Sequence, residues 1–250
     1  MPKEIEKRFF KFDEARLKEQ IIALGGVRKG IFHFKVINFK PPASLDRLRL
    51  REEGFRITFT IKKKGADGYD EENEVIVNNF EEMETILTKL GYEKKDYFHK
   101  IREIYNIGDC ELIFDHLPGL VPYVEIEAPS EGELFSLSDR LGLDKTEGKK
   151  GMGDLYREVY GVEKSLDITF MNAVDLIMPY IEKSKELKEK FWEIITQQNE
   201  LLKRVDNAKG ASPSGSNSSS GHSLIGGNNT YYAKYLKYRS KYLSLKSSIV

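Results

Sequence analysis

A single cysteine, Cys110, occurs among the 250 residues, which excludes an intramolecular disulfide framework and a cysteine-rich zinc site. No apolar run approaches the ~20 residues of a membrane-spanning helix. The first ten residues, MPKEIEKRFF, lack the apolar region of a signal peptide. Basic and acidic side chains number 40 each, so the chain is not basic overall, although this balance says nothing about local patches. We therefore expect a cytoplasmic protein whose charges act locally.

The composition changes near residue 207 and divides the chain. Hydrophobic residues make up 40% of the sequence, which is enough for a core. Residues 210–229 are rich in Gly, Ser and Asn and predict a flexible linker. We expect four parts: a domain over 1–165, a helical or coiled-coil extension over 172–207, a linker over 208–229 and a basic tail over 230–250.

The extension has apolar residues at spacings of four and three from Leu187 to Val205. This spacing is typical of a coiled-coil seam, through which residues 180–206 would form a homodimer. A helix that packs on the preceding domain of its own chain explains the spacing equally well. Pro179 is expected to kink or break the first turns of this region.

Strand and helix patterns alternate over residues 1 to about 170. Three helices are expected, at residues 13–24, 79–91 and 130–142. Eight strands are expected, at residues 3–10, 33–39, 47–51, 55–64, 73–77, 99–105, 110–116 and 123–128. The expected fold class is α+β, with antiparallel strands flanked by helices.

Several strands carry like charges two residues apart, with apolar side chains between them. Side chains on a strand alternate between its faces, so each set of charges shares one face. A sheet face exposed to solvent explains the charges of any one strand, but it gives no reason for acids and bases to occur on separate strands. A barrel with a charged interior explains this separation. The sets are Glu4 and Glu6; Arg47, Arg49 and Arg51; Lys62 and Lys64; Glu72 and Glu74; Lys100 and Arg102; Glu125 and Glu127.

A charged interior of this kind suits a metal–polyphosphate complex. Arginine offers forked hydrogen bonds to phosphate oxygens, and lysine offers a compact charge. Carboxylates hold Mg²⁺ or Mn²⁺ and share the ion with substrate phosphates. An eight-stranded β-barrel is wide enough to hold one small ligand.

The segment EIEKRF at residues 4–9 resembles the E-x-E-x-K signature of the CYTH family, the triphosphate tunnel metalloenzymes, which include class IV adenylyl cyclases and thiamine triphosphatases. Further motifs follow in the family's order, over about residues 2–162. The resemblance implies an eight-stranded antiparallel tunnel that binds triphosphate substrates with a divalent metal. These motifs are RLREEG (49–54), TIKKK (60–64), KIREIY (100–105), LIFDHLPGL (112–120), YVEIEA (123–128) and KKGMGDLYREVYG (149–161).

The resemblance also implies roles for individual residues. The metal ligands would be Glu4, Glu6, Asp115, Glu125 and Glu127, with Glu72 and Glu74 as further tunnel carboxylates. Phosphates would bind Arg8, Arg49, Arg51, Lys62, Lys64, Lys100, Arg102, Lys149 and Lys150. The catalytic set would be Glu4, Glu6, Lys62 and Arg102. Arg8 stands where the signature has lysine, so a role that needs a neutral amine is in doubt there.

The implied activity is hydrolysis of inorganic tripolyphosphate or a nucleoside triphosphate with Mg²⁺ or Mn²⁺. A class IV adenylyl cyclase, an RNA 5′-triphosphatase and a non-catalytic binder of polyphosphate or nucleotide are the alternatives. The tail KYLKYRSKYLSLK (234–246) resembles C-terminal segments of giant DNA virus proteins, which would place the protein in a host cytoplasm or virus factory. Such a tail is a solvated basic helix or a contact for a membrane surface or nucleic acid.

Overall fold

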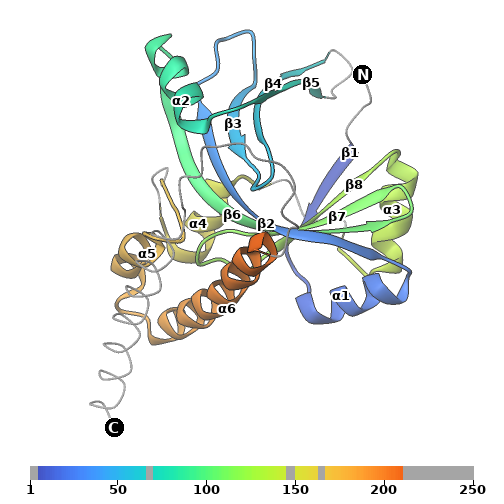
Figure 1. Ribbon diagram of the computed structural model, residues 1–250. Helices are drawn as coiled ribbons and strands as arrows, with labels where there is room; N and C mark the ends of the chain where they lie inside the picture. Colours follow the sequence, from blue (N-terminus) through green and yellow to red (C-terminus); the bar gives the residue numbers. More distant parts are fainter. Residues whose placement is uncertain (1–4, 66–69, 145–149, 163–166, 211–250) are drawn as a thin grey trace.

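The computed structural model describes residues 5–65, 70–144, 150–162 and 167–210 (Figure 1). Glu4, Lys149, almost all of the predicted linker and the whole basic tail lie outside these ranges. None of the helices within the described ranges is long and apolar enough to cross a membrane.

Eight antiparallel strands form one sheet in the order β1-β8-β7-β6-β2-β3-β4-β5. Their bounds are β1 (Ile5–Phe9), β2 (Val27–Phe39), β3 (Arg47–Glu52), β4 (Ile57–Lys64), β5 (Asp70–Val77), β6 (Lys94–Ile107), β7 (Cys110–His116) and β8 (Tyr123–Ala128). The predicted α+β fold with eight antiparallel strands is confirmed. The barrel is not closed, because β1 and β5 are edge strands that do not pair with each other within the described residues.

The two longest strands, β2 and β6, hold the sheet together. They have 13 and 14 residues and pair from Val27 and Asn106 to Phe39 and Lys94. Figure 1 shows the sheet bending about this pair, with β3, β4 and β5 on one side and β7, β8 and β1 on the other. The sheet therefore has two halves that share β2 and β6 and face each other across its concave side.

Three helices cover the outer, apolar face of the sheet, and each begins at a side-chain cap. α1 (Glu14–Ala23) and α3 (Glu131–Arg140) pack on the β1, β7 and β8 half, and α2 (Phe80–Lys89) packs on the β3 and β4 half. The caps Asp13, Asn79 and Ser130 accept hydrogen bonds from backbone N–H groups three residues later. Because apolar side chains face these helices, the alternating charged ones face the concave side.

The C-terminal region consists of α4 (Met152–Tyr160), α5 (Ala173–Ile181) and α6 (Lys185–Gly210). Pro179 lies inside α5, which ends two residues later. Along α6, Phe191 and Ile195 are fully buried against α4 and α5, and Val205 is buried against Ile31 and Ile101 of the sheet. These apolar residues of the predicted coiled-coil face therefore pack on the chain's own domain. Packing of this kind requires the same apolar spacing as a coiled coil.

Gln198 fastens α6 to the loop between β7 and β8. Its Oε1 accepts a hydrogen bond from the N–H of Gly119 at 2.9 Å, and its Nε2 donates to the carbonyls of Leu117 and Leu120 at 2.7 and 3.0 Å. The hydroxyl of Tyr156 on α4 donates to the carbonyl of Pro118 at 2.8 Å. Buried backbone groups of this loop therefore depend on side chains from the C-terminal helices.

We expect Gln198→Ala to lower the free energy of unfolding by about 2–4 kcal/mol, because it removes side-chain hydrogen bonds from three buried backbone groups, although the Leu117 carbonyl keeps its bond from the Leu120 N–H. Urea unfolding followed by the fluorescence of Trp192, the single tryptophan, measures this change. Gln197→Ala is the matched control, since its exposed side chain hydrogen-bonds Glu193 of the same helix, and we expect a change within about 0.5 kcal/mol. Equal effects of the two substitutions would show that α6 is not an integral part of the domain.

Candidate functional site: a charged cavity on the concave face

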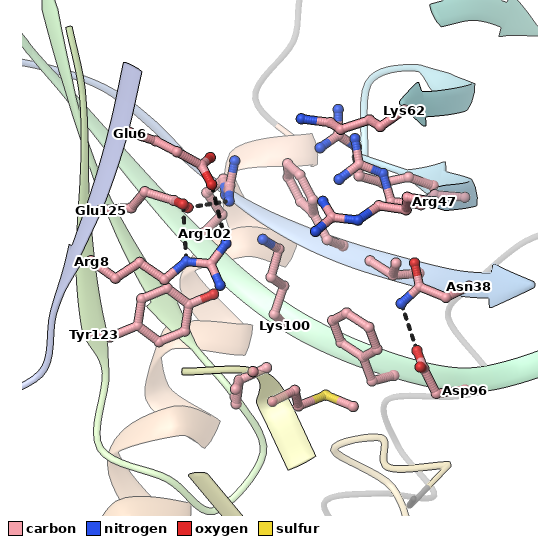
Figure 2. A pocket seen from close by; sticks show the side chains of 18 of the residues that line it. Glu6, Arg8, Asn38, Arg47, Lys62, Asp96, Lys100, Arg102, Tyr123 and Glu125 are labelled. Atoms are coloured by element: carbon pink, nitrogen blue, oxygen red, sulfur yellow. Dashed lines mark hydrogen bonds and ion pairs between the residues drawn. The ribbon is translucent and has the colours of Figure 1, made fainter. Parts of the chain in front are cut away.

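The concave face encloses a cavity of about 950 Å³ between the two halves of the sheet. Its lining contains most of the charged residues that the sequence placed on shared strand faces (Figure 2). Two groups of charges face each other there. Carboxylates predominate on β1 and β8, and arginines and lysine predominate on β3 and β4.

The acidic side of the cavity contains Glu6 of β1 with Glu125 and Glu127 of β8. Glu6 pairs in register with Glu127, and its neighbour on the same face, Arg8, pairs with Glu125. One carboxylate oxygen from each of the three glutamates lies within 4.8 Å of the others. Burial, together with the charge of Glu6, raises the pKa of Glu125. Three crowded oxygen donors of this kind fit a hard divalent cation such as Mg²⁺ or Mn²⁺.

Arg8, which stands at the signature's lysine position, holds these carboxylates together. Its Nε donates to Glu125 Oε1 at 3.0 Å, its Nη2 lies 4.0 Å from Glu6 Oε1, and its guanidinium lies over the ring of Tyr123. Burial alone would lower the pKa of Arg8. The charges of Tyr123, Glu125 and Glu6 outweigh burial, so this pKa lies above its usual value. Arg8 is therefore a fixed cation that positions the glutamates, and it cannot act as a proton acceptor.

Asp115 of β7 is fully buried behind this group and organises two cations. Arg102 donates to both of its oxygens, at 2.9 and 2.8 Å, and Lys100 Nζ donates to Oδ2 at 2.7 Å. The hydroxyl of Tyr123 also donates to Oδ2, at 2.9 Å. Burial works to raise the pKa of Asp115, but Arg102 and Lys100 outweigh it and hold this pKa well below its usual range.

This network describes how Asp115 is bound in the cavity, and the metal-ligand role that the resemblance implies for it stays a prediction. Its two oxygens already accept four hydrogen bonds, and it does not belong to the group of carboxylates formed by Glu6, Glu125 and Glu127. Asp115 therefore positions Lys100 and Arg102 at the floor of the cavity. Burial, with the nearby charge of Arg102, lowers the pKa of Lys100 to about 7.

The basic side of the cavity contains Arg47, Arg49 and Arg51 on one face of β3. Burial first, and then the charges of Arg51 and Arg47, lower the pKa of Arg49 to about 10. The Nε atoms of Arg49 and Arg51 are buried and have no hydrogen-bond partner among the described residues. Three neighbouring cations, two of them with an unsatisfied donor, favour an anionic ligand.

Lys62 of β4 adds a fourth cation, and two glutamates of β5 offset part of the charge. Lys62 Nζ lies 2.5 Å from Glu72 Oε2, and Arg49 Nη2 lies 3.5 Å from Glu72 Oε1. Arg51 Nη2 lies 3.4 Å from Glu74 Oε2, which also accepts from the hydroxyl of Thr60 at 2.9 Å. Glu72 and Glu74 thus orient the basic side chains, in line with their expected place among the tunnel carboxylates.

The remaining predicted phosphate-binding residues are less central. Lys64 is exposed at the end of β4 and does not line the cavity. Lys150 lines the cavity, but its Nζ pairs with Glu158 of α4 at 2.5 Å. Glu4 and Lys149 lie outside the described residues.

Sequence reasoning left several cavity residues unassigned, among them Arg47, Tyr123, Asn38 and Asp96. Arg47 continues the charged face of β3 and could have been found from that alternation alone. Tyr123, Asn38 and Asp96 carry no such signal, because only the register of the strands places them beside Asp115 or beside each other.

The sequence matches the CYTH domain over residues 3–142, which is more than half of the chain. The chain belongs to the CYTH domain family. A curated relative from Methanocaldococcus jannaschii, named "Putative adenylate cyclase MJ0240", is 30% identical to this CYTH protein over 127 residues. That alignment covers 50% of this chain and 66% of the relative, just under two thirds of its length.

Solved structures share the fold. The PH1012 protein from Pyrococcus horikoshii superposes with a TM-score of 0.54 at 23% identity, and the match covers 61% of this CYTH chain and 98% of the other. A conserved hypothetical protein from Pyrococcus furiosus gives a TM-score of 0.54 at 18% identity and covers 61% and 99% of the two chains.

Proposed function

We propose that this protein is a divalent-metal-dependent triphosphatase that hydrolyses inorganic tripolyphosphate or a nucleoside triphosphate in the concave cavity. One observation carries the proposal. Three clustered carboxylates face a group of arginines with unsatisfied donors across a single cavity. Membership of the CYTH family supports it, because both halves of the site lie within the matched residues.

The chain's own residues do most of what phosphoryl transfer requires, which is positioning and neutralisation of charge. Arg49, Arg51 and Lys62 bind phosphate oxygens from one side, and Lys100 and Arg102 bind them from the floor. Glu6, Glu125 and Glu127 would hold Mg²⁺ or Mn²⁺. Such an ion, when bound, neutralises phosphate charge and lowers the pKa of water. Arg8 and Asp115 keep these groups in place.

A class IV adenylyl cyclase is the second candidate, and the printed name of the Methanocaldococcus relative favours it. Both activities use the same phosphate clamp and differ in the nucleophile. Water attacks a terminal phosphorus in the triphosphatase, and the ribose 3′-oxygen attacks the α-phosphorus in the cyclase. Product analysis with ATP and Mn²⁺ or Mg²⁺ separates them. Orthophosphate supports the triphosphatase, whereas cyclic AMP with pyrophosphate overturns it in favour of the cyclase.

We expect Arg49→Ala to weaken binding of inorganic tripolyphosphate by about 10- to 100-fold, because it removes charge-assisted hydrogen bonds. The variant should fold, since the substitution also removes repulsion between Arg49 and its neighbours on β3. Isothermal titration calorimetry at fixed ionic strength measures the change. Lys64→Ala, on the neighbouring strand outside the cavity, is the control and should bind as the wild type does. Equal affinities of the two variants would exclude Arg49 from the phosphate site.

A further inference from the structure

The convex face of the sheet carries a second group of side chains that can bind a metal. Glu103 of β6 and His116 of β7 are buried there, and Glu14 is the first residue of α1, which packs over these two strands. One ligand atom from each of the three lies within 4.8 Å of the others. The group combines two carboxylates with an imidazole, whereas the group in the cavity consists of carboxylates alone.

The register of the strands places this group behind the cavity. His116 pairs with Ile101, so it is a diagonal neighbour of Glu103 on the same face of the sheet. Arg102 lines the cavity, and the next residue, Glu103, therefore faces the other way. The two groups of ligands thus lie on opposite faces of the sheet.

An ammonium group marks the place of a cation between the two carboxylates. Lys18 Nζ lies 2.6 Å from Glu14 Oε1 and 2.5 Å from Glu103 Oε2. Arg28 and the hydroxyl of Tyr105 donate to the other oxygen of Glu103, Oε1. The side chains of Lys18 and Glu14 are 21% and 30% exposed, so the ammonium can leave toward solvent and an ion can enter.

The imidazole of His116 is the group that the ammonium leaves unsatisfied. Its side chain is 4% exposed, and its Nε2 lies 3.4 Å from Glu14 Oε1 without a hydrogen-bond partner in the described part of the chain. Burial lowers the pKa of His116, so the ring is neutral near pH 7 and can present a lone pair at Nε2. A metal ion at this place would satisfy the imidazole as well as both carboxylates.

We propose that Glu14, Glu103 and His116 form a Zn²⁺ site on the convex face. The ion displaces the ammonium of Lys18, and Glu103 keeps its bonds at Oε1. Ligand atoms about 2.0–2.1 Å from a tetrahedral Zn²⁺ lie about 3.3 Å from one another, close to the 3.4 Å between His116 Nε2 and Glu14 Oε1. The nitrogen ligand favours Zn²⁺ over Mg²⁺, and water completes the fourth position.

A pair of histidines, His33 and His99, is the rival place for Zn²⁺. His33 Nε2 lies 3.1 Å from His99 Nδ1, and the hydroxyl of Tyr97 lies 2.7 Å from His99 Nε2. Both ring nitrogens of His99 are therefore engaged in hydrogen bonds that an ion would have to break. The buried Nε2 of His116 has no such bond to lose within the described residues.

The test titrates Zn²⁺ into the full-length protein by calorimetry, with excess Mg²⁺ present to fill the all-carboxylate group in the cavity. We expect one Zn²⁺ to bind to the wild-type protein, and we expect His116→Gln and Glu14→Gln to weaken this binding by about 100-fold. Co²⁺ in place of Zn²⁺ should give the strong visible absorption of a four-coordinate ion, which His116→Gln should abolish. Melting temperatures without metal establish that each variant folds.

Lys18→Met separates a metal site from an ion-pair network. It should strengthen Zn²⁺ binding by about tenfold, because the ion no longer displaces a hydrogen-bonded ammonium. Arg16→Met is the matched control, since it removes an exposed charge from the same helix, and it should bind Zn²⁺ as the wild type does.

Four results would overturn the inference. Wild-type protein that binds no Zn²⁺, or a Lys18→Met variant that binds no more tightly than Arg16→Met, would show that the group is an ion-pair network. Unchanged binding in His116→Gln, or loss of binding in His33→Gln, would place the ion elsewhere. Turnover of tripolyphosphate with Mg²⁺ is measured separately, and its absence would contradict the triphosphatase without touching this site on the other face of the sheet.

Discussion

Replacing Asp115 by alanine is expected to lower the free energy of unfolding by about 3–5 kcal/mol, because it leaves the charges of Lys100 and Arg102 buried without their partner. Asp115 is fully buried, and the side chains of Lys100 and Arg102 are 10% and 12% exposed. Water in the cavity reaches only a small part of these two side chains, so it compensates only in part for the missing carboxylate. Urea unfolding followed by tryptophan fluorescence measures the loss.

Glu111→Ala is the matched control for this substitution. Glu111 lies on the same strand as Asp115 and lines the same cavity, but it is only half-buried. Burial raises the pKa of Glu111, and the charges of Arg102 and Lys29 lower it by less. We expect its loss to change stability by less than about 1 kcal/mol. Comparable effects of the two substitutions would contradict the central place of Asp115.

The pH dependence of stability gives an independent check on Asp115. Its pKa in the folded state lies below the unfolded value of about 3.9. The stabilisation is therefore fully present above that unfolded value and is lost as the pH falls toward the folded one. The wild-type protein should lose stability from about pH 5 downward more steeply than Asp115→Ala does. Parallel profiles of the two proteins would show that Asp115 is not the responsible group.

Glu6→Gln is expected to reduce kcat for triphosphate hydrolysis by about 10²-fold or more, because it removes one charged donor from the carboxylate group that fits the metal. The glutamine is close in shape to glutamate, and Glu6 is 22% exposed, so the fold should be retained. The measurement is release of orthophosphate from tripolyphosphate at saturating Mg²⁺. Binding of tripolyphosphate in EDTA should stay near that of the wild type, since Glu6 belongs to the acidic side of the cavity and the phosphates are expected to bind the basic side.

Glu111→Gln is the control for Glu6→Gln. Glu111 pairs in register with Glu127 and lines the cavity, but it lies outside the group of three carboxylates. Its kcat should stay within a few-fold of wild type. A protein that binds tripolyphosphate but has no activity to lose would instead support the non-catalytic binder. A Glu6 variant with full activity would remove that residue from the site.

The strands and their charged faces could be predicted from the sequence because alternation is a local property. Arg49, Lys62, Glu125 and their neighbours are placed on one face by their spacing alone, and the structure brings them to one cavity. The opening between β1 and β5 could not be predicted, since it depends on pairing between strands far apart in the chain.

Two other features needed the structure for a similar reason. The apolar spacing of α6 allows a homodimer or intramolecular packing, and only the tertiary contacts of Phe191 and Val205 distinguish them. Asp115 has the charge of a metal ligand in the sequence. Only the register that pairs it with Arg102 and Tyr123 shows that it anchors cations.

Phosphorus-31 NMR of inorganic tripolyphosphate incubated with the purified protein tests the central claim most directly. We predict that signals of orthophosphate and pyrophosphate grow in equal amounts when Mg²⁺ or Mn²⁺ is present, and that EDTA abolishes this growth. The Glu6→Gln variant should slow it by about 10²-fold. If neither tripolyphosphate nor ATP yields a product with either metal, the cavity is not that of a triphosphate-processing enzyme.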